Sequence, residues 1–202
     1  MTNLSSPAVI FVSFAIYGAL HTFLASRTAK DWARKQFGDA LVDKTYRLFF
    51  NFIGVITLLP VLYLVAWLPD APLYSAPAFL RPFLLAGQVA AILILAAALN
   101  KTDALDFAGL RQLGEDAKAP PLITDGVYRW VRHPLYTGIM LFLWLIPDVS
   151  VNFFALNVAI TLYFVVGAMF EERKLERYFG KTYTDYKART PMFVPWLRAG
   201  RN

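Results

Sequence analysis

Long apolar runs constrain the fold of this chain more than any other feature of its sequence. A helix of about 18 or more predominantly apolar residues is long enough to cross the hydrocarbon core of a bilayer. Four stretches meet this length and a fifth is shorter: 8–25, 46–68, 79–99 and 151–170, with 135–147 as the short one. Hydrophobic residues make up 57% of the 202 residues, which is too many for a soluble protein of this size. We therefore expect an all-α integral membrane protein.

The positions of the basic residues predict how the chain crosses the membrane. Of the 20 Lys and Arg residues, six lie in 26–47, five in 100–133 and eight in 171–202, which leaves only Arg81 elsewhere. Five membrane-spanning helices with the N-terminus outside place all three segments on the cytoplasmic side, as the positive-inside rule expects. We interpret the net charge of +6 as membrane topology, and expect no nucleic-acid partner. In a prokaryote this would be the inner or plasma membrane.

The connections between the apolar runs differ in character. We expect a mostly helical basic connection over 26–47, irregular structure over 100–133, a tight turn at 147–152 and a polar cytoplasmic helix over 171–189. The first run has no basic flank and no small-residue cleavage site, so we expect no removable signal peptide. The absence of cysteine excludes disulfides, cysteine metal sites and a cysteine nucleophile.

Two charged motifs lie at the ends of the last two apolar runs. The first is GVYRWVRHPLYTG at 126–138, and the second is the acid pair, Glu171 and Glu172. An antiparallel hairpin of spans four and five would bring these motifs together, and ionisable groups at membrane depth are usually functional. In the alternative interpretation, Arg129 and Arg132 are ordinary cytoplasmic flanks, Pro134 is a helix-start proline and the acids are solvated. Acids at a helix C-terminus oppose its dipole, which weakens that alternative.

Together the motifs predict a polarised binding site. The helix start with Arg132 and His133 suits a carboxylate, because free backbone N–H groups and charged donors meet there. The acid pair suits an ammonium group or a ribose diol. A zwitterionic, nucleoside-like ligand fits both halves.

The same residues resemble the integral-membrane methyltransferases, which include isoprenylcysteine carboxyl methyltransferase, the phospholipid N-methyltransferases and bacterial relatives. The family pattern is G-x-Y-x-x-x-R-H-P-x-Y-x-G, then Glu-Glu, then F-G-x-x-Y-x-x-Y and a late proline. The matching residues are Gly126, Tyr128, Arg132, His133, Pro134, Tyr136, Gly138, Glu171, Glu172, Phe179, Gly180, Tyr183, Tyr186 and Pro195.

The resemblance implies a fold, a cofactor and a binding site. It implies a single membrane domain over 1–202, with a three-span part at 1–99 and a cofactor-binding loop, hairpin and C-terminal helix at 100–202. The cofactor would be S-adenosyl-L-methionine, released as S-adenosyl-L-homocysteine, with no metal. Arg132, His133 and the helix start would hold its carboxylate, and the acid pair its ribose or amino group. The implied cofactor-binding residues are Gly126, Tyr128, Arg132, His133, Pro134, Tyr136, Gly138, Glu171 and Glu172.

These residues also receive individual roles from the resemblance. Tyr128 and Tyr136 would line the cofactor, and Gly138 would let it approach the helix backbone.

The N-terminal half resembles a bacterial branch with small-thiol S-methyltransferases and a denitrification-associated protein of uncertain activity. That branch carries a His followed by a small hydroxyl residue in its first span, here His21 and Thr22. His21, Arg111 and Gln112 are therefore candidates for substrate binding. The alternatives are a packed histidine, and a loop pair that hydrogen-bonds neighbouring carbonyls.

The implied reaction is an in-line methyl transfer to a lipophilic or small thiol or carboxylate acceptor. Alignment of the reactants supplies most of the acceleration in such reactions, so we name no catalytic base. Two alternative functions remain. One is an NADPH-dependent sterol-type reductase, whose family shares R-H-P-x-Y-x-G, and the other is a non-catalytic membrane protein of the same fold.

The charge distribution gives the first testable prediction. A reporter that is active only in the cytoplasm should be active when it is fused after Asn202. In that orientation 19 of the 20 basic residues lie on the cytoplasmic side of the membrane. A fusion at the same site to a reporter that is active only outside the cytoplasm is the control. Activity of that second reporter alone would show that the orientation is reversed.

Overall fold

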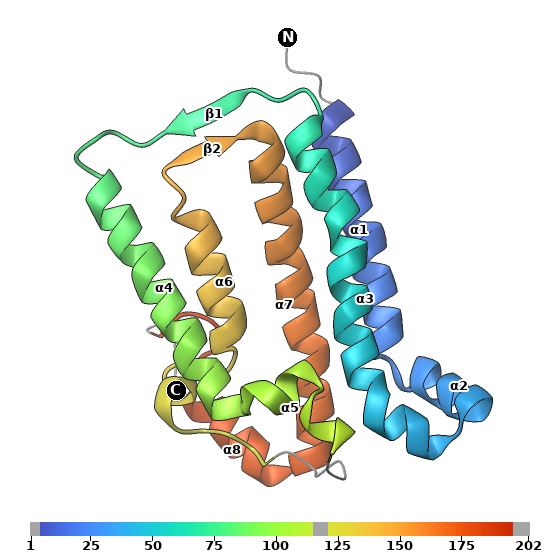
Figure 1. The fold of residues 1–202 in the computed structure, drawn as a ribbon. Helices are drawn as coiled ribbons and strands as arrows, with labels where there is room; N and C mark the ends of the chain where they lie inside the picture. Colours follow the sequence, from blue (N-terminus) through green and yellow to red (C-terminus); the bar gives the residue numbers. More distant parts are fainter. Residues whose placement is uncertain (1–4, 115–120, 196–202) are drawn as a thin grey trace. The chain divides into compact units, whose positions relative to one another are not determined.

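The computed structural model describes residues 5–114 and 121–195 (Figure 1). Residues 115–120 of the expected irregular connection and the tail at 196–202 lie outside the described part. The chain divides into two compact units. Unit 1 contains Met1–Leu73, Asp103–Ala119 and Ser150–Ala159, and unit 2 contains Tyr74–Thr102, Pro120–Val149 and Ile160–Asn202. These boundaries differ from the expected division at residue 100, and the functional division of the chain stays a prediction.

Four helices in the described part are long and apolar enough to cross a membrane. They are α1 (Ser5–Ala25), α3 (Asp39–Trp67), α4 (Arg81–Thr102) and α7 (Val151–Phe179). Their outward side chains are large and apolar, and Trp67 and Phe83 are each 74% exposed. Such exposure suits lipid rather than water. The four long runs are thus confirmed as candidate membrane helices.

The fifth apolar run forms a shorter helix than the others. Helix α6 (Pro134–Trp144) has 11 residues. At the helical rise this is about 16 Å, against roughly 30 Å for the hydrocarbon core of a bilayer. The five-span count and the membrane hairpin stay predictions.

In unit 1, α1 lies beside α3 (Figure 1). The basic connection between them is α2 (Arg27–Phe37), which begins where the Ser26 hydroxyl accepts a hydrogen bond of 3.2 Å from the Ala29 N–H. It ends at Gly38, whose φ of 84° breaks the helix, and α3 begins at the next residue. The expectation that this connection is mostly helical is confirmed.

The segment after Thr102 packs onto α3 within unit 1. It forms α5 (Ala104–Ala108) and the 3₁₀ turn η1 (Arg111–Leu113). Arg47 pairs with Asp106 at 2.5 Å, and the Asn51 side chain donates to the carbonyls of Phe107 and Ala108 at 2.9 Å. These contacts give regular structure to part of a connection expected to be irregular.

In unit 2, α4 packs closely against α6 (Figure 1). A Cβ added at Gly138 would lie 2.7 Å from Leu95 Cγ, and one at Gly87 would lie 2.5 Å from Leu145 Cδ1. The Gln88 side chain donates to the Phe142 carbonyl at 3.2 Å. Small residues therefore let the two backbones approach, as in many membrane helix pairs.

Two short strands add to the helices that the sequence predicts. Strand β1 (Pro72–Ser75) pairs with β2 (Asp148–Ser150), which forms the expected turn after α6. Asp148 pairs with Arg81 at 2.7 Å and accepts from the Ser75 hydroxyl at 2.5 Å. Within residues 5–114 and 121–195 the regular structure is helical apart from this small sheet, which the expectation of an all-α chain did not include.

The structure corrects the expected break before the polar helix. Helix α7 continues to Phe179, and α8 (Lys181–Arg189) follows after Gly180, whose φ is 55°. Residues 171–177 are good helix formers, so the helix runs on until the first glycine. The acid pair therefore lies inside α7, and the argument from an unfavourable helix-end dipole does not apply.

The packing of the 103–113 segment gives the second prediction. Gly109 has a φ of 86°, and a Cβ there would lie 2.5 Å from the Leu48 backbone nitrogen. Gly109→Ala should destabilise the protein by more than about 1 kcal/mol and lower Tm by at least about 2–4 °C. Gly114→Ala is the matched control, because nothing lies within 4 Å of its added Cβ. Equal Tm values for the two variants in detergent would show that the segment is not fixed in this way.

Candidate functional site

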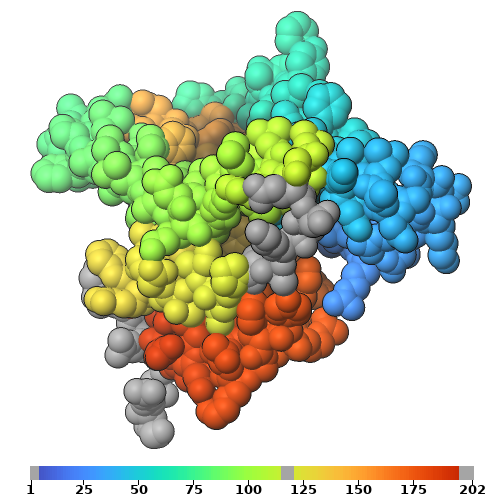
Figure 2. Space-filling model, turned by 60° about the horizontal axis from the view of Figure 1, so that its bottom comes forward, coloured from blue at the N-terminus to red at the C-terminus, as the bar shows by residue number. Residues whose placement is uncertain are grey.

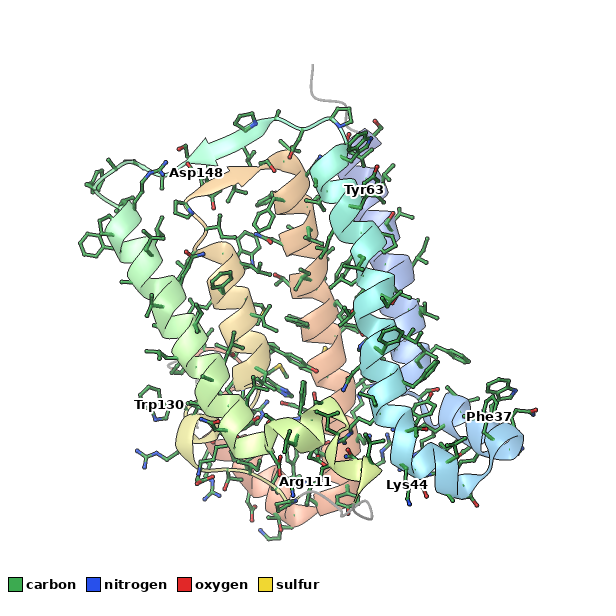
Figure 3. The ribbon with its side chains drawn as sticks, in the orientation of Figure 1. Phe37, Lys44, Tyr63, Arg111, Trp130 and Asp148 are labelled. Carbon is green, nitrogen blue, oxygen red and sulfur yellow. The ribbon has the colours of Figure 1, made fainter. Side chains whose placement is uncertain are left out.

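The 126–138 motif folds as a turn followed by a helix start. The 3₁₀ turn η2 (Gly126–Arg129) begins at Gly126, whose φ is 59°, and α6 begins at Pro134, directly after His133. Proline suits the first helical position because its missing N–H has no partner there in any case. Arg129 is exposed, and Trp130 is 64% exposed and projects outward in Figure 3. The motif thus has an exposed side, with Arg129 and Trp130, and another side that packs inside unit 2.

The expected proximity of the two motifs is confirmed within unit 2. Arg132 Nη2 and Nε lie 2.5 Å and 2.7 Å from Glu172 Oε1. The Nε2 atom of His133 lies 3.3 Å from the same oxygen. The Arg132 and Glu172 side chains are only 8% and 3% exposed. In Figure 2 the yellow segment before α6 lies directly against the orange residues of α7 and α8.

Lys187 of α8 completes this group of charges. Its Nζ lies 3.0 Å from Glu172 Oε2 and 2.8 Å from Glu176 Oε1. We call Arg132, Glu172 and Lys187 the Glu172 cluster, in which Arg132 and Glu172 are buried and the Lys187 side chain is 40% exposed. The sequence analysis did not select Lys187, although its position four residues after Tyr183 places both on one side of the polar helix.

Residues 190–193, the C-terminal segment, run along the start of α6. The N–H of Arg132 donates to the Pro191 carbonyl at 2.9 Å, and the N–H of His133 donates to the Met192 carbonyl at 3.2 Å. The Arg132 guanidinium also donates to the carbonyls of Thr190 and Lys187. No feature of the sequence predicted this pairing beyond the late proline of the family pattern.

Tyr186 ties α8 to the same motif. Its hydroxyl donates to the Tyr128 carbonyl at 2.6 Å, and Tyr186 is only 3% exposed. One of the two tyrosines of the F-G-x-x-Y-x-x-Y pattern is therefore a structural link to the η2 turn.

Glu171 lies on the opposite, more open side of the group. Its side chain is 45% exposed and accepts a hydrogen bond of 3.1 Å from the Tyr136 hydroxyl. His133 Nδ1 lies 3.7 Å from the same carboxylate. The rings of His133 and Tyr136 stack in parallel at 5.5 Å, and Phe164 stacks on Tyr136 at 4.7 Å. This side offers a carboxylate beside a wall of aromatic rings.

Two further tyrosines near the acid pair keep their protons. Burial raises the pKa of Tyr128 to about 12, and the negative charge of Glu171 acts in the same direction. Burial also raises the pKa of Tyr183, which is only 1% exposed. The Tyr183 hydroxyl has no hydrogen-bond partner among the described residues. Both phenols can therefore act as neutral hydrogen-bond donors.

The structure gives Gly138 a role in helix packing, and the cofactor role that the resemblance implied stays a prediction. The space over its Cα is filled by Leu95 of α4, and the residue is buried. Close packing of α4 on α6 explains this glycine without any approach of a cofactor.

The three candidates for substrate binding lie in unit 1, whereas the nine candidates for cofactor binding lie in unit 2. The His21 ring packs on the Phe50 ring at 4.5 Å and against Gly54. Arg111 pairs with Asp103 at 2.5 Å, and the Gln112 side chain donates to the Asp106 carboxylate at 2.7 Å. These contacts match the alternatives of a packed histidine and a loop-stabilising pair, and substrate binding stays a prediction.

The long apolar helices and the clustered motifs define a class, the polytopic membrane proteins that resemble integral-membrane methyltransferases. The comparison with known proteins names the family. Residues 9–198 match the family model described as NnrU protein, so the chain belongs to the NnrU family. The resemblance to the methyltransferases is confirmed by its relatives.

Two relatives show the range of this similarity. Methanethiol S-methyltransferase 2 of Bradyrhizobium diazoefficiens is 30% identical over 207 residues, which cover 99% of this chain and 78% of that protein. Protein-S-isoprenylcysteine O-methyltransferase B of Arabidopsis thaliana is 33% identical over 81 residues, which cover 38% of this chain and 40% of that protein. No solved structure matches the chain.

The link between α8 and η2 gives the third prediction. Tyr186→Phe removes the donor to the Tyr128 carbonyl and should destabilise the protein by about 1 kcal/mol or more, because a part-buried acceptor loses its partner. Tyr178→Phe is the control, since Tyr178 is 62% exposed. Thermal unfolding in detergent measures both. Equal stability of the two variants would mean that water replaces the lost hydroxyl.

Proposed function

We propose that this protein is a membrane methyltransferase that transfers the methyl group of S-adenosylmethionine to the sulfur of a small thiol. The observation that carries the proposal is the similarity over 99% of the chain to a relative named methanethiol S-methyltransferase 2. The similarity to the isoprenylcysteine enzyme covers only 38% of the chain. The longer match favours a small thiol over a prenylated acceptor.

The residues of unit 2 fit a zwitterionic cofactor with a positively charged sulfur. The start of α6 has backbone N–H groups that no helical carbonyl can satisfy, which suits a carboxylate. Glu171 provides a carboxylate for a cationic group, with the Tyr136 ring beside it. The neutral phenol of Tyr128 adds a donor near Glu171.

Bound S-adenosylmethionine would supply an electrophilic methyl group on a sulfonium. Glu171 would balance positive charge on the open side of the site, and the stacked rings of Tyr136 and Phe164 would exclude water from it. Alignment of the two reactants is worth up to about 7–11 kcal/mol in favourable cases, so rigid placement of these side chains is their main contribution.

The fourth prediction tests the reaction and its acceptor. Purified protein with methyl-labelled S-adenosylmethionine should label methanethiol faster than a prenylcysteine analogue or a phospholipid amine. Asp185→Asn should react like the parent, because Asp185 is exposed and its ion pair is with Lys181, one turn away on α8.

Calorimetric titrations with S-adenosylhomocysteine and NADPH separate the alternatives. Binding of the first ligand alone is the expected result. Binding of NADPH alone would indicate a reductase, and binding of neither would indicate a non-catalytic protein.

A further inference from the structure

Helix α2 of unit 1 has a surface that packing inside the protein does not explain. Its buried residues are the small Ala29 and Ala33, which are 5% and 6% exposed. Its two large aromatic residues, Trp32 and Phe37, are each 61% exposed. Their rings lie edge to face with centroids 6.3 Å apart, so they form one aromatic patch. A helix that served only to fill the core would turn its large apolar residues inward, and this patch is therefore suited to an apolar partner outside the described part of the chain.

Helix α2 also lies where the apolar parts of two candidate membrane helices end. The apolar run of α1 ends at Ala25, and that of α3 begins after Arg47. The Tyr46 hydroxyl donates to the Leu24 carbonyl at 2.7 Å, so the two runs end at the same level. Residues 39–45 of α3 continue beyond this level for about 10 Å.

Figure 1 shows α2 beside the adjoining ends of α1 and α3, both of which it contacts. The polar headgroups form a layer about 5–8 Å thick on each side of a bilayer. Helix α2 therefore lies at the depth of this layer, where tryptophan is enriched in membrane proteins.

Ion pairs hold α2 in this position. Arg34 of α2 pairs with Asp39 and Asp43 at the start of α3, at 3.8 Å and 2.8 Å, and with Asp31 of its own helix at 3.5 Å. These are the three acids of the 26–47 segment, which contains six Lys and Arg residues. The acids are thus gathered around one arginine, and the segment keeps an excess of positive charge.

Two cations of α2 have no acidic partner. Arg27 and Lys35 are exposed, and no carboxylate in the described part of the chain forms an ion pair with either. At about 100° per residue, both lie on the side of α2 opposite Ala29 and Ala33. They therefore face away from the protein, toward the surrounding headgroup layer. Clusters of four to eight Lys and Arg directly after a membrane helix are typical of segments that bind anionic lipids.

Helix α8 shows that a basic helix of this chain need not carry such a patch. It contains Lys181, Lys187 and Arg189 against one acid, Asp185. Its two aromatic residues are Tyr183 and Tyr186, which are only 1% and 3% exposed. Helix α8 thus has cations without an exposed aromatic patch, and α2 combines the two.

We propose that α2 binds the headgroups of anionic phospholipids at the membrane surface. Arg27 and Lys35 contact the lipid phosphates, and Trp32 and Phe37 insert at the boundary between the headgroups and the acyl chains. This lipid site lies in unit 1 and is independent of the proposed methyl transfer. It is testable without any cofactor.

The absence of cysteine makes the test direct, because Gln36→Cys creates a single labelling site on α2. The protein carries a fluorophore there and is reconstituted in phosphatidylcholine vesicles. Equal small amounts of nitroxide-labelled phosphatidylglycerol or nitroxide-labelled phosphatidylcholine then serve as quenchers. One cation near the headgroups contributes about 1 kcal/mol toward an anionic lipid, so the anionic quencher should be about fivefold more effective. A fluorophore at Thr182→Cys on α8 should be quenched less by either lipid.

Matched charge changes test the residues themselves. Replacement of both Arg27 and Lys35 by glutamine should abolish the preference for the anionic quencher. Replacement of both Lys181 and Arg189 by glutamine removes the same charge from α8 and should leave the preference unchanged. Salt gives a test without any change to α2 beyond the label, because the Debye length falls to about 3 Å at about 1 M salt and the preference should disappear.

The outcomes that overturn the proposal are distinct. Equal quenching by the two lipids, or a preference that survives high salt, would show that α2 does not select anionic headgroups. No quenching by either lipid would show that α2 lies away from the bilayer and that its aromatic patch binds a protein instead. An equal loss of preference in the α2 and α8 charge variants would assign the effect to the net charge of the protein.

Discussion

The buried ion pair between Arg132 and Glu172 is the interaction on which the rest of this site depends. Two charges removed from water are tolerated only when good geometry and further hydrogen bonds compensate them. Here the guanidinium contacts Glu172 and two backbone carbonyls, and the carboxylate contacts Lys187 and His133 as well. Removal of one partner from such a pair typically costs about 3–5 kcal/mol, because it leaves an unpaired buried charge. The pair therefore fixes three segments at once: the start of α6, the last third of α7 and the C-terminal segment.

Close helix packing determines where this ion pair is built. Gly138 lets α6 lie against Leu95 of α4. Further along α6, the Phe142 carbonyl accepts a hydrogen bond from the Gln88 side chain of α4. The end of α4 is joined to the η2 turn through an ion pair of Lys101 and Asp125. The start of α6 is thus held from α4 on one side and from the C-terminal segment on the other. A binding site at a helix start needs such support, because free N–H groups bind an anion only if the helix start is fixed.

Much of this architecture could be predicted from the sequence, because hydrophobic length and helix signals are local. The four long apolar runs became four long helices, and the 126–138 motif and the acid pair came together. One error has a physical cause. The sequence predicts a helix end where the apolar run stops at residue 170, but α7 continues to Phe179 because the residues that follow are good helix formers. Gly138 also packs against α4, a contact that its place in the motif did not indicate.

Other features could not be predicted because they depend on residues distant in the chain. The pairing of Arg132 and His133 with the carbonyls of Pro191 and Met192 uses backbone atoms, which carry no residue-specific signal. The sequence does not indicate Lys187 as a partner of Glu172, because their contact depends on how α8 packs against α7.

Helix geometry explains why a doubled acid in the sequence has two roles. Successive residues of an α-helix point about 100° apart, whereas residues four positions apart lie on the same face. Glu172 and Glu176 share a face, so one lysine reaches both carboxylates, at 3.0 Å and 2.8 Å. Glu171 is turned away from that lysine toward Tyr136 and the open side. A Glu-Glu pair inside a helix therefore supplies one buried acid, which pairs with Arg132 and Lys187, and one exposed acid on the other side of the helix.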